Sequence, residues 1–196
     1  TVALKTDGSL WAWGYGGLGQ IGNGSFTTNF NAPQQIGIAK NWQTIVTGHG
    51  HTAALKTDGS LWAWGNNFSG QLGIGNSLDR NTPTRVGTAN DWQLVAAGKL
   101  HTVALKKDGT LWTWGNNTYG TLGDGTTTKK TSPIQIGTED NWKTISAGSD
   151  HTIAIKKDGT LWAWGDNTYG ALGDGTTMNK LVPTQIGSST DWKTIN

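Results

Sequence analysis

The chain has 196 residues, 30 of them glycine, no cysteine, and a formal net charge of only +2 at pH 7. So weak a charge argues against a nucleic-acid partner, the lack of cysteine removes disulfides, and no apolar run is long enough to span a bilayer. Apolar residues make up 34% of the sequence, which favours a loop-rich repeat array whose burial comes largely from 12 tryptophans.

The sequence repeats itself about every fifty residues. Tryptophan and proline each recur at a step of 50, at Trp42, Trp92, Trp142 and Trp192 and at Pro33, Pro83, Pro133 and Pro183. A repeat of this length is one supersecondary unit, which buries its apolar faces only against its neighbours. We therefore predict one array over residues 1–196, with units at about 1–41, 42–91, 92–141 and 142–191. Residues 192–196 are expected to complete the unit begun at residue 1.

Short strands alternate with turns inside each unit. The run at 101–106 alternates in side-chain size, and the run at 61–64 is nearly apolar on both faces. Asp-Gly joins such runs in every copy, as at Asp58-Gly59, and predicts a type I′ turn with positive φ at both central residues. A third strand is expected after each proline, as at 184–186. Proline has no backbone N–H to donate, but at the start of a strand this donor falls outside the ladder of backbone hydrogen bonds. The fourth begins at the lone tryptophan, as at 142–145.

The nearly apolar strand indicates that both faces of each sheet are covered. Trp62 and Trp64 lie two apart and share one face, whereas Leu61 and Ala63 share the other. One face of each sheet thus carries large side chains and the other carries smaller ones, which suits wedge-shaped sheets packed side by side. No stretch carries a helical period, so the predicted fold is all-β, a β-propeller of four-stranded blades.

The motifs of these units are distinctive. In the fourth copy they are Gly148-x-x-His151-Thr152, then Asp158-Gly159, Trp164-Gly165 and Gly170-x-Leu172-Gly173. This pattern resembles the regulator of chromosome condensation repeat family, in a tryptophan-rich variant common in bacteria. The resemblance covers effectively the whole chain. It implies a propeller of four-stranded blades, usually seven, closed by strands from both chain ends.

Four repeats are fewer than the resemblance implies for a closed ring. Three arrangements stay open: a fragment of a longer propeller, a two-chain ring of eight blades, and a strained ring of four. An incomplete array exposes apolar blade faces and unpaired strand edges, and we favour the fragment of a seven- or eight-blade ring. A homodimer that closes an eight-blade ring ranks second.

Histidine and tryptophan recur at fixed positions of the repeat. His51, His101 and His151 could form a ring of metal ligands or general bases. A catalytic site, however, is rarely repeated identically in every unit of a repeat protein. We therefore predict that these imidazoles are buried and structural, bonded to backbone or to the next blade. His49 lies outside the pattern and has no third metal ligand in view. The lone tryptophans of the four units are predicted to be structural as well: Trp42, Trp92, Trp142 and Trp192.

The acidic residues and glycine runs indicate no catalytic or cofactor site. Asp58 and its counterparts are turn residues. Asp124 and Asp174 resemble half of a calcium loop but lack a glutamate at EF-hand spacing, so a structural loop is favoured. The run at 120–125 lacks the helix and lysine of a phosphate cradle. With no nucleophile paired to a base, we predict no enzyme activity, no metal and no cofactor.

Loop residues that differ between copies are the candidate binding residues, because propeller blades are scaffold and their loops bind. They fall before each proline (26–32, 77–82, 127–132 and 177–182), after Trp-Gly, and between the glycine and the histidine. The candidates in these three groups are Phe26, Asp79, Arg80, Lys129 and Lys130, then Tyr15, Phe68, Tyr119 and Tyr169, then His49, Lys99 and Asp150.

We expect a non-enzymatic recognition scaffold that binds a protein partner through loops on one propeller face. A glycan is the alternative, favoured by near-identical repeats, whereas the offset of Tyr15 and the dissimilar loops before the prolines favour a protein. Guanine-nucleotide exchange on a small GTPase ranks third, because in the family's founding member it uses a protruding insertion and these units are uniform. The bacterial variant points to a secreted, extracellular or cell-surface protein, with a cytoplasmic location left open.

Overall fold

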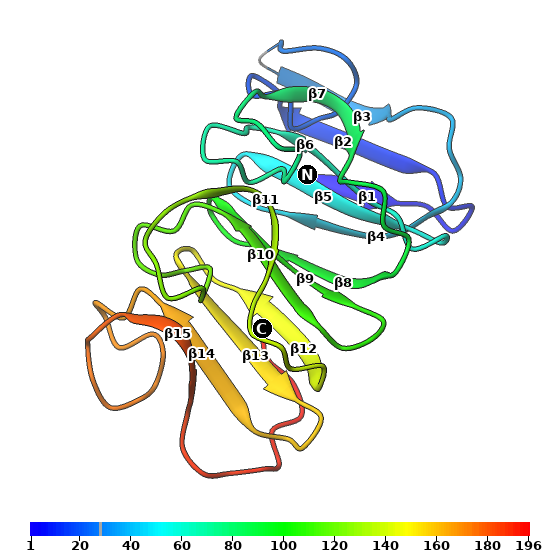
Figure 1. Ribbon diagram of the computed structural model, residues 1–196. Helices are drawn as coiled ribbons and strands as arrows, with labels where there is room; N and C mark the ends of the chain where they lie inside the picture. The colour runs from blue at the N-terminus through cyan, green and yellow to red at the C-terminus, as the bar shows by residue number, and fades with distance from the viewer. Residues whose placement is uncertain (28) are drawn as a thin grey trace.

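The computed structural model describes residues 1–27 and 29–196, and in those residues all regular structure is β. Four sheets follow one another along an arc, from the first at the blue end to the fourth at the orange end (Figure 1). Each sheet is one propeller blade, so the predicted all-β propeller fold is confirmed. None of the described residues belongs to a helix with the length and apolar character that a bilayer crossing demands.

The strands of each blade are antiparallel and pair in chain order. Blade 1 contains β1 (Val2–Leu4), β2 (Leu10–Tyr15) and β3 (Asn29–Gln35). The four strands of blade 2 are β4 (Trp42–Thr47), β5 (His51–Lys56), β6 (Leu61–Gly65) and β7 (Arg80–Arg85). Blade 3 contains β8 (Trp92–Ala97), β9 (His101–Lys106), β10 (Leu111–Gly115) and β11 (Lys130–Gln135). Blade 4 contains β12 (Trp142–Ala147), β13 (His151–Lys156), β14 (Leu161–Gly165) and β15 (Lys180–Gln185).

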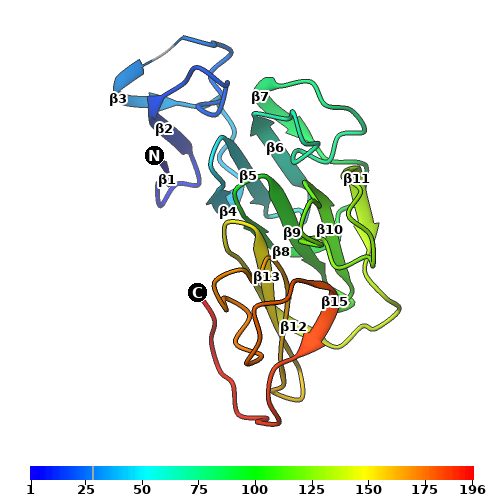
Figure 2. The ribbon, with the colours of Figure 1, turned by 90° about the vertical axis from the view of Figure 1, so that its left-hand side faces the viewer.

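Blade 1 has three strands where the others have four. Its first strand, β1, corresponds to the second strand of the other blades and pairs only with β2. The segment 192–196 is outside any strand, and Figure 2 shows the two chain ends on different blades. Trp192 is 42% exposed, whereas Trp42, Trp92 and Trp142 are buried. The expected completion of blade 1 by residues 192–196 therefore stays a prediction.

The Asp-Gly hairpin turn differs from the predicted type. Of the two residues Asp58 and Gly59, only Gly59 has a positive φ, which is 79°. Its counterpart Gly8 has a φ of 78°, and among the described residues only glycines have a positive φ. The Gly59 amide donates to the Lys56 carbonyl at 2.9 Å, which makes a type I turn followed by a left-handed glycine. The Asp58 carboxylate accepts from the amide and hydroxyl of Ser60, at 2.9 and 2.6 Å. This side-chain cap holds the aspartate in the ordinary φ region, so the predicted type I′ turn was wrong.

The outermost strand begins before its proline, earlier than predicted. In blade 2 it starts at Arg80 and contains Pro83. The ladder with β6 shifts register between Ala63 and Gly65, and it pairs Gly65 with Arg80 and Ala63 with Thr84. The proline thus sits at an irregularity of an edge strand, where its missing donor breaks no ladder hydrogen bond.

Neighbouring blades pack a large aromatic face against a smaller aliphatic one, as the alternation predicts. Leu61 and Ala63 of blade 2 join a buried cluster with Trp92 and Trp114 of blade 3. Trp64, on the opposite face of blade 2, is fully buried in a cluster with residues of blade 1. The predicted division of the 61–64 strand into two faces is confirmed.

A lysine sits between two indoles in each complete blade. The Lys156 ammonium lies 4.9 Å from the Trp142 ring and 3.8 Å from the Trp162 ring. Lys56 and Lys106 make the same pair of contacts in their own blades. Such cation–π contacts stabilise by about 0.5–2 kcal/mol each and fix the ends of the inner strands.

Candidate functional site

The candidate binding residues gather at one end of the blades, which we call the loop face. His51, the first residue of β5, pairs with Gly65, the last residue of β6. The short loop 48–50 and the long loop 66–79 therefore leave blade 2 at the same end. The same holds for loops 98–100 and 116–129, and for 148–150 and 166–179. The opposite end, with the Asp-Gly turns, is the turn face. Position 28 of the predicted segment 26–32 lies outside the described residues.

In blades 2, 3 and 4, the long loop is fastened to its own blade by one buried asparagine. The Asn67 side chain donates to the carbonyls of Asn76 and Leu78, at 2.9 and 3.1 Å, and accepts from the Leu72 amide at 3.0 Å. Asn117 and Asn167 repeat this arrangement in blades 3 and 4. A fully satisfied buried amide fixes the loop backbone, so the loop tips are presented in one conformation.

The aspartates of these loops have partners inside the loop. Lys130 lies 3.2 Å from the Asp124 carboxylate, and Lys180 lies 2.9 Å from Asp174. Burial works to raise the pKa of Asp124, but hydrogen bonds from Thr126 and Asn117 and the Lys130 ammonium outweigh it and lower the pKa. In blades 3 and 4 a lysine thus stands beside the carboxylate that resembled half of a calcium loop.

Two further candidates are also held within the loops. The Asp79 carboxylate accepts from the Asn67 amide at 2.6 Å, and the Arg80 guanidinium donates to the Asp79 carbonyl at 3.1 Å. Asp79, Arg80 and Lys130 are therefore occupied by contacts within their own blade. Within residues 1–27 and 29–196, no cluster of three or more metal-ligating side chains is found.

The long loops also fasten each blade to the next one. The Gly75 amide of blade 2 donates to the Thr131 carbonyl of blade 3 at 2.9 Å, and Gly125 does the same to Leu181 of blade 4. The Lys129 ammonium donates to the Phe68 carbonyl at 3.2 Å and lies 5.6 Å from the Phe68 ring. Phe68 and Lys129, predicted from different loops, thus meet at the junction of blades 2 and 3.

Every blade presents an aromatic ring on its long loop, even though the sequence positions differ. Tyr15 precedes its loop, but its ring lies over Gly17, where an added Cβ would be 2.4 Å from the Tyr15 hydroxyl. Gly17 corresponds to Phe68 in the repeat, so the offset of Tyr15 is largely compensated in space. The rings of Tyr15, Phe68, Tyr119 and Tyr169 are all exposed, and Tyr169 is 94% exposed.

The predicted segments 77–82 and 177–182 contain exposed apolar residues that the sequence analysis did not single out. Leu78, Met178 and Leu181 are exposed and lie in the long loops or within two residues of them. The signal was present as a large apolar side chain in a segment otherwise made of serine, threonine and asparagine. Such residues have no core to fill in a loop, which marks them as candidate contact residues.

The repeated histidines bridge consecutive blades beneath the loop face. His51 Nε2 lies 3.0 Å from the Thr102 hydroxyl, which donates its hydrogen to the Gln71 carbonyl at 2.8 Å. Since the hydroxyl hydrogen is used, His51 must donate through Nε2, and its Nδ1 carries no proton. His101 and Thr152 repeat the contact at 3.2 Å. Burial lowers the pKa of His51 to about 4, and burial with its neighbours His51 and His151 lowers the pKa of His101 to about 3.

The three short loops converge around the axis of the arc. His49, Lys99 and Ser149 line a shallow open hollow together with the glycines at 48, 98 and 148. The Lys99 amide donates to the Ser149 carbonyl at 3.0 Å, and the Ser149 hydroxyl donates to the Asp150 carboxylate at 2.9 Å. The predicted candidates His49 and Lys99 therefore line the same hollow, and Asp150 contacts Ser149 in the third short loop.

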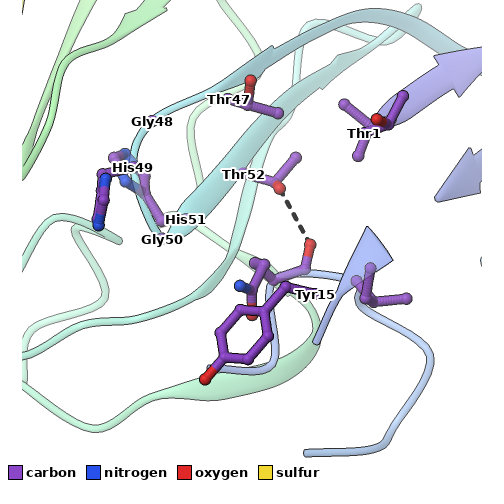
Figure 3. A pocket seen from close by; sticks show the side chains of 11 residues that line it. Thr1, Tyr15, Thr47, Gly48, His49, Gly50, His51 and Thr52 are labelled. Atoms are coloured by element: carbon purple, nitrogen blue, oxygen red, sulfur yellow. Dashed lines mark hydrogen bonds between the residues drawn. The ribbon is translucent and has the colours of Figure 1, made fainter. Parts of the chain in front are cut away.

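A second hollow, of about 260 Å³, lies between blades 1 and 2 (Figure 3). Tyr15 and Thr1 border it from blade 1, and His49 and Thr52 border it from blade 2. The Thr52 hydroxyl donates to the Gln20 carbonyl at 3.1 Å. The hollow combines hydroxyl, amide and imidazole groups, which can bind by hydrogen bonds.

The chain matches known proteins along its whole length. A family model described as the RCC1-like domain matches residues 1–196. The Ultraviolet-B receptor UVR8 of Arabidopsis thaliana is 37% identical over 83 residues, which are 41% of this chain and 19% of that protein. Human RCC2 is 41% identical over 83 residues, which are 40% of this chain and 15% of that protein.

Solved structures resemble the blades closely. Prp20p from Saccharomyces cerevisiae, studied for its binding to Gsp1p and histones, matches with a TM-score of 0.84 and 26% identity. That match covers 96% of this chain and 48% of Prp20p. Human WBSCR16 also matches with a TM-score of 0.84, at 25% identity, over 95% of this chain and 50% of its own. The chain thus spans about half the length of these structures and a smaller share of the two curated relatives named above, both of which are eukaryotic.

Proposed function

This chain belongs to the RCC1-like propeller family, and from that premise we propose that it is a non-enzymatic scaffold that binds a protein partner through its loop face. Proteins of similar structure support the proposal. Prp20p is described as binding Gsp1p and histones, and yeast RCC1 (Prp20) has been solved bound to Kap60. A fold hosts many functions, so the partner of this chain has to be argued from its own surface.

The observation that carries the proposal is the distribution of exposed apolar side chains. The described residues expose eleven large apolar side chains. Eight lie in the long loops or within two residues of them: Tyr15, Phe26, Phe68, Leu78, Tyr119, Tyr169, Met178 and Leu181. Aromatic and methionine side chains gathered on one face are typical of protein interfaces.

The anchoring of the loops supports a specific rather than a loose surface. Asn67, Asn117 and Asn167 hold the loops of blades 2, 3 and 4 to their own blades, and the Gly75 and Gly125 amides hold the loops of blades 2 and 3 to the next blade. A surface already fixed in one conformation loses little entropy when it binds. Phe68 and Tyr169 can therefore act as rigid contact residues.

A glycan is the second candidate, and the placement of Tyr15 favours it. With the Tyr15 ring over Gly17, all four blades offer an aromatic ring from the same loop, as equivalent sugar sites would. The neighbours of these rings differ, since Lys129 lies beside Phe68 and no lysine lies beside Tyr119 or Tyr169 among the cation–π contacts of the described residues. Dissimilar surroundings favour one extended protein surface over four copies of a sugar site.

The proposal is tested by capture with matched variants. Phe68→Ser with Tyr169→Ser removes two loop-face rings, and Ile38→Ser removes an equally exposed apolar side chain, 93% exposed, from the turn face. We expect a defined set of proteins to be captured by wild type and by Ile38→Ser and to be lost with the loop-face variant. Capture of the same set by all three would contradict the proposal. Glycan-array binding that disappears only in the loop-face variant would move the assignment to sugar.

A further inference from the structure

A groove of about 460 Å³ lies at the junction of blades 1 and 2, and none of the candidate binding residues borders it. The segment 35–39, which leads from the end of β3 toward β4, borders the groove together with Trp42, Lys56 and Trp62 of blade 2. The Lys56 ammonium lies 4.7 Å from the Trp42 ring and 4.2 Å from the Trp62 ring. The groove therefore presents a positive charge that is held between two indoles.

The same groove recurs where two complete blades meet. A groove of about 560 Å³ lies at the junction of blades 3 and 4, and Trp142 and Trp162, the counterparts of Trp42 and Trp62, border it. Blades 3 and 4 each contain four strands. The groove is thus a regular feature of a junction between blades, and its copies can be compared residue by residue.

At the two other junctions the corresponding lysine is paired with a carboxylate of the chain itself. The Lys156 ammonium lies 2.8 Å from Glu139, and the Lys106 ammonium lies 3.2 Å from Asp91. Both acids belong to the segment that connects one blade to the inner strand of the next. Glu139 borders the groove of blades 3 and 4, and the Lys156 side chain is only 5% exposed. A carboxylate carried by a peptide segment therefore binds the ammonium at both junctions.

The junction of blades 1 and 2 has neither of these acids. By repeat equivalence, Ala39 stands in the place of Glu139, and Asn41 stands in the place of Asp91. Within residues 1–27 and 29–196, no carboxylate forms an ion pair with Lys56. Lys56 instead borders the open groove, where a carboxylate from another molecule can reach it.

The other charged groups nearby have partners of their own. Hydrogen bonds from Ser60 and, to a smaller extent, the charge of Lys56 lower the pKa of Asp58. The Asp58 carboxylate accepts from the amide and hydroxyl of Ser60, at 2.9 and 2.6 Å. Lys40, on the connecting segment, lies 3.1 Å from the Asp7 carboxylate. Lys56 is therefore the charge that a ligand in the groove meets.

We propose that the groove at the junction of blades 1 and 2 binds an acidic segment of a partner protein, whose aspartate or glutamate side chain pairs with Lys56 as Glu139 pairs with Lys156. The occupant follows from charge complementarity, since the two other junctions fill the same site with a carboxylate carried by a peptide. A hydrogen bond between an ammonium and a carboxylate is stronger than one between neutral groups, and the two indoles already hold the ammonium in place. This inference goes beyond the proposed function, because it uses a second surface that contains none of the candidate loop residues.

The first test uses a peptide that copies the chain's own acidic segment. The probe is Ile-Gly-Thr-Glu-Asp-Asn, the sequence of 136–141, with both ends blocked so that only its side chains carry charge. NMR titration of the indole N–H signals is expected to give a saturable shift for Trp42 and Trp62, with a Kd of about 1 mM or below. The absence of a saturable shift of these two signals up to roughly 10 mM peptide would overturn the proposal.

Matched variants and a matched probe assign the binding to the charge. Lys56→Met keeps the apolar stem between the indoles and is expected to weaken binding of the probe about tenfold or more. Ile38→Ser removes an exposed side chain that also borders the groove, and is expected to change the Kd by less than about threefold because the ammonium stays. A probe with glutamine and asparagine in place of its two acids is expected to bind about tenfold more weakly. Undiminished binding to Lys56→Met, or equal binding of the two probes, would overturn the proposal.

The second test moves the carboxylate between the two grooves. Ala39→Glu gives Lys56 an internal partner at high effective concentration and is expected to abolish binding of the probe, whereas the uncharged Ala39→Gln is expected to retain it. Glu139→Ala uncovers Lys156 and is expected to create a second site, so that the Trp162 signal, unmoved in the wild type, shifts as well. A variant that fails to fold cannot imitate this gain. Wild-type affinity in Ala39→Glu, or an unmoved Trp162 signal in Glu139→Ala, would refute the pairing.

The groove and the loop face can be tested apart. Phe68 and Tyr169 do not border the groove, so the loop-face variant is expected to bind the probe with the affinity of the wild type. Lys56→Met is in turn expected to keep the proteins that are captured through the loop face. Loss of the probe in the loop-face variant would show that the groove is not an independent surface and would contradict this inference. Retention of the probe in a chain that captures no protein through its loops would leave the groove proposal standing and refute the other.

Discussion

Acid is expected to weaken the junctions of blades 2 and 3 and of blades 3 and 4, because the histidine that bridges each of these two junctions is neutral in the native chain. His51 and His101 are buried, and each donates through Nε2 to a threonine of the next blade. His51 Nδ1 is buried with no hydrogen-bond partner among the described residues. A proton added there would place an unpaired charge inside the junction. The carboxylates of Asp150 and Asp166 lie near His151, where they raise its pKa and partly offset the lowering that burial causes.

The size of the effect follows from the pKa values of the two buried histidines. An unfolded histidine has a pKa of 6.5, and the native values are about 4 for His51 and about 3 for His101. Between pH 6.5 and 4 the unfolded chain binds protons that the native chain does not, so the free energy of unfolding falls as the pH falls. At pH 5 the loss is about 2 kcal/mol for each histidine, or about 4 kcal/mol together. The pKa of His151 is also lowered by burial, which adds in the same direction.

Urea unfolding followed by tryptophan fluorescence measures this loss at pH 7.5, 6.5, 5.5 and 5. The aspartates have pKa values lowered from an ordinary value of 3.8, so they affect stability only at lower pH. The change in the free energy of unfolding above pH 5 therefore comes from the histidines. A chain with His51→Gln and His101→Gln keeps an amide donor at both junctions and is expected to lose most of the pH dependence. His49→Gln, in the exposed short loop, is expected to keep it. Equal stability of the wild type at pH 7.5 and pH 5 would refute the neutral bridge.

Two further substitutions test the packing of the junctions and the anchoring of the loops. Gly73→Ala places a Cβ 2.6 Å from the Trp114 indole at positive φ, so it is expected to cost roughly 2–4 kcal/mol in urea unfolding. Gly87→Ala, at positive φ in open space, is expected to cost only about 1 kcal/mol, and equal losses would contradict the close contact. Asn117→Ala leaves buried loop groups unpaired, costing about 2 kcal/mol and exposing 116–129 to proteases, whereas Asn116→Ala is expected to leave that loop resistant.

The blade fold could be predicted because each unit repeats its own signals. The alternation in 61–64 fixed which side chains face which neighbour, and the buried clusters agree with it. The turn type could not be predicted from Asp-Gly alone, since the carboxylate of Asp58 caps Ser60 and holds the aspartate at negative φ. The start of the outer strand was missed for a similar reason. An edge strand with a register shift accepts Pro83, so proline marks no boundary there.

The candidate site was harder to predict, because a loop sequence does not show which groups are already paired. Asp79 differs between copies as a binding residue would, and Lys130 lies in a segment predicted to bind, yet both are held by contacts within their own blade. Tyr15 looked out of place in the sequence, and only the position of its ring over Gly17 restores the match with the other blades. Variation between copies therefore leads to loops at one face of the propeller, whose role in binding stays a prediction, and it does not show which residues there are already paired.

The proposed binding surface on the loop face is physically coupled to the packing between blades. The long loop of blade 2 is fastened to the outer strand of blade 3 through Gly75 and Thr131, and to the long loop of blade 3 through Phe68 and Lys129. The exposed rings therefore keep their spacing only while the junction beneath them is intact. Since protonation of His101 acts on the junction of blades 3 and 4, acid should disturb the spacing of rings that lie far from the histidine itself. A partner that contacts two adjacent rings should accordingly dissociate at a pH above that at which the chain unfolds.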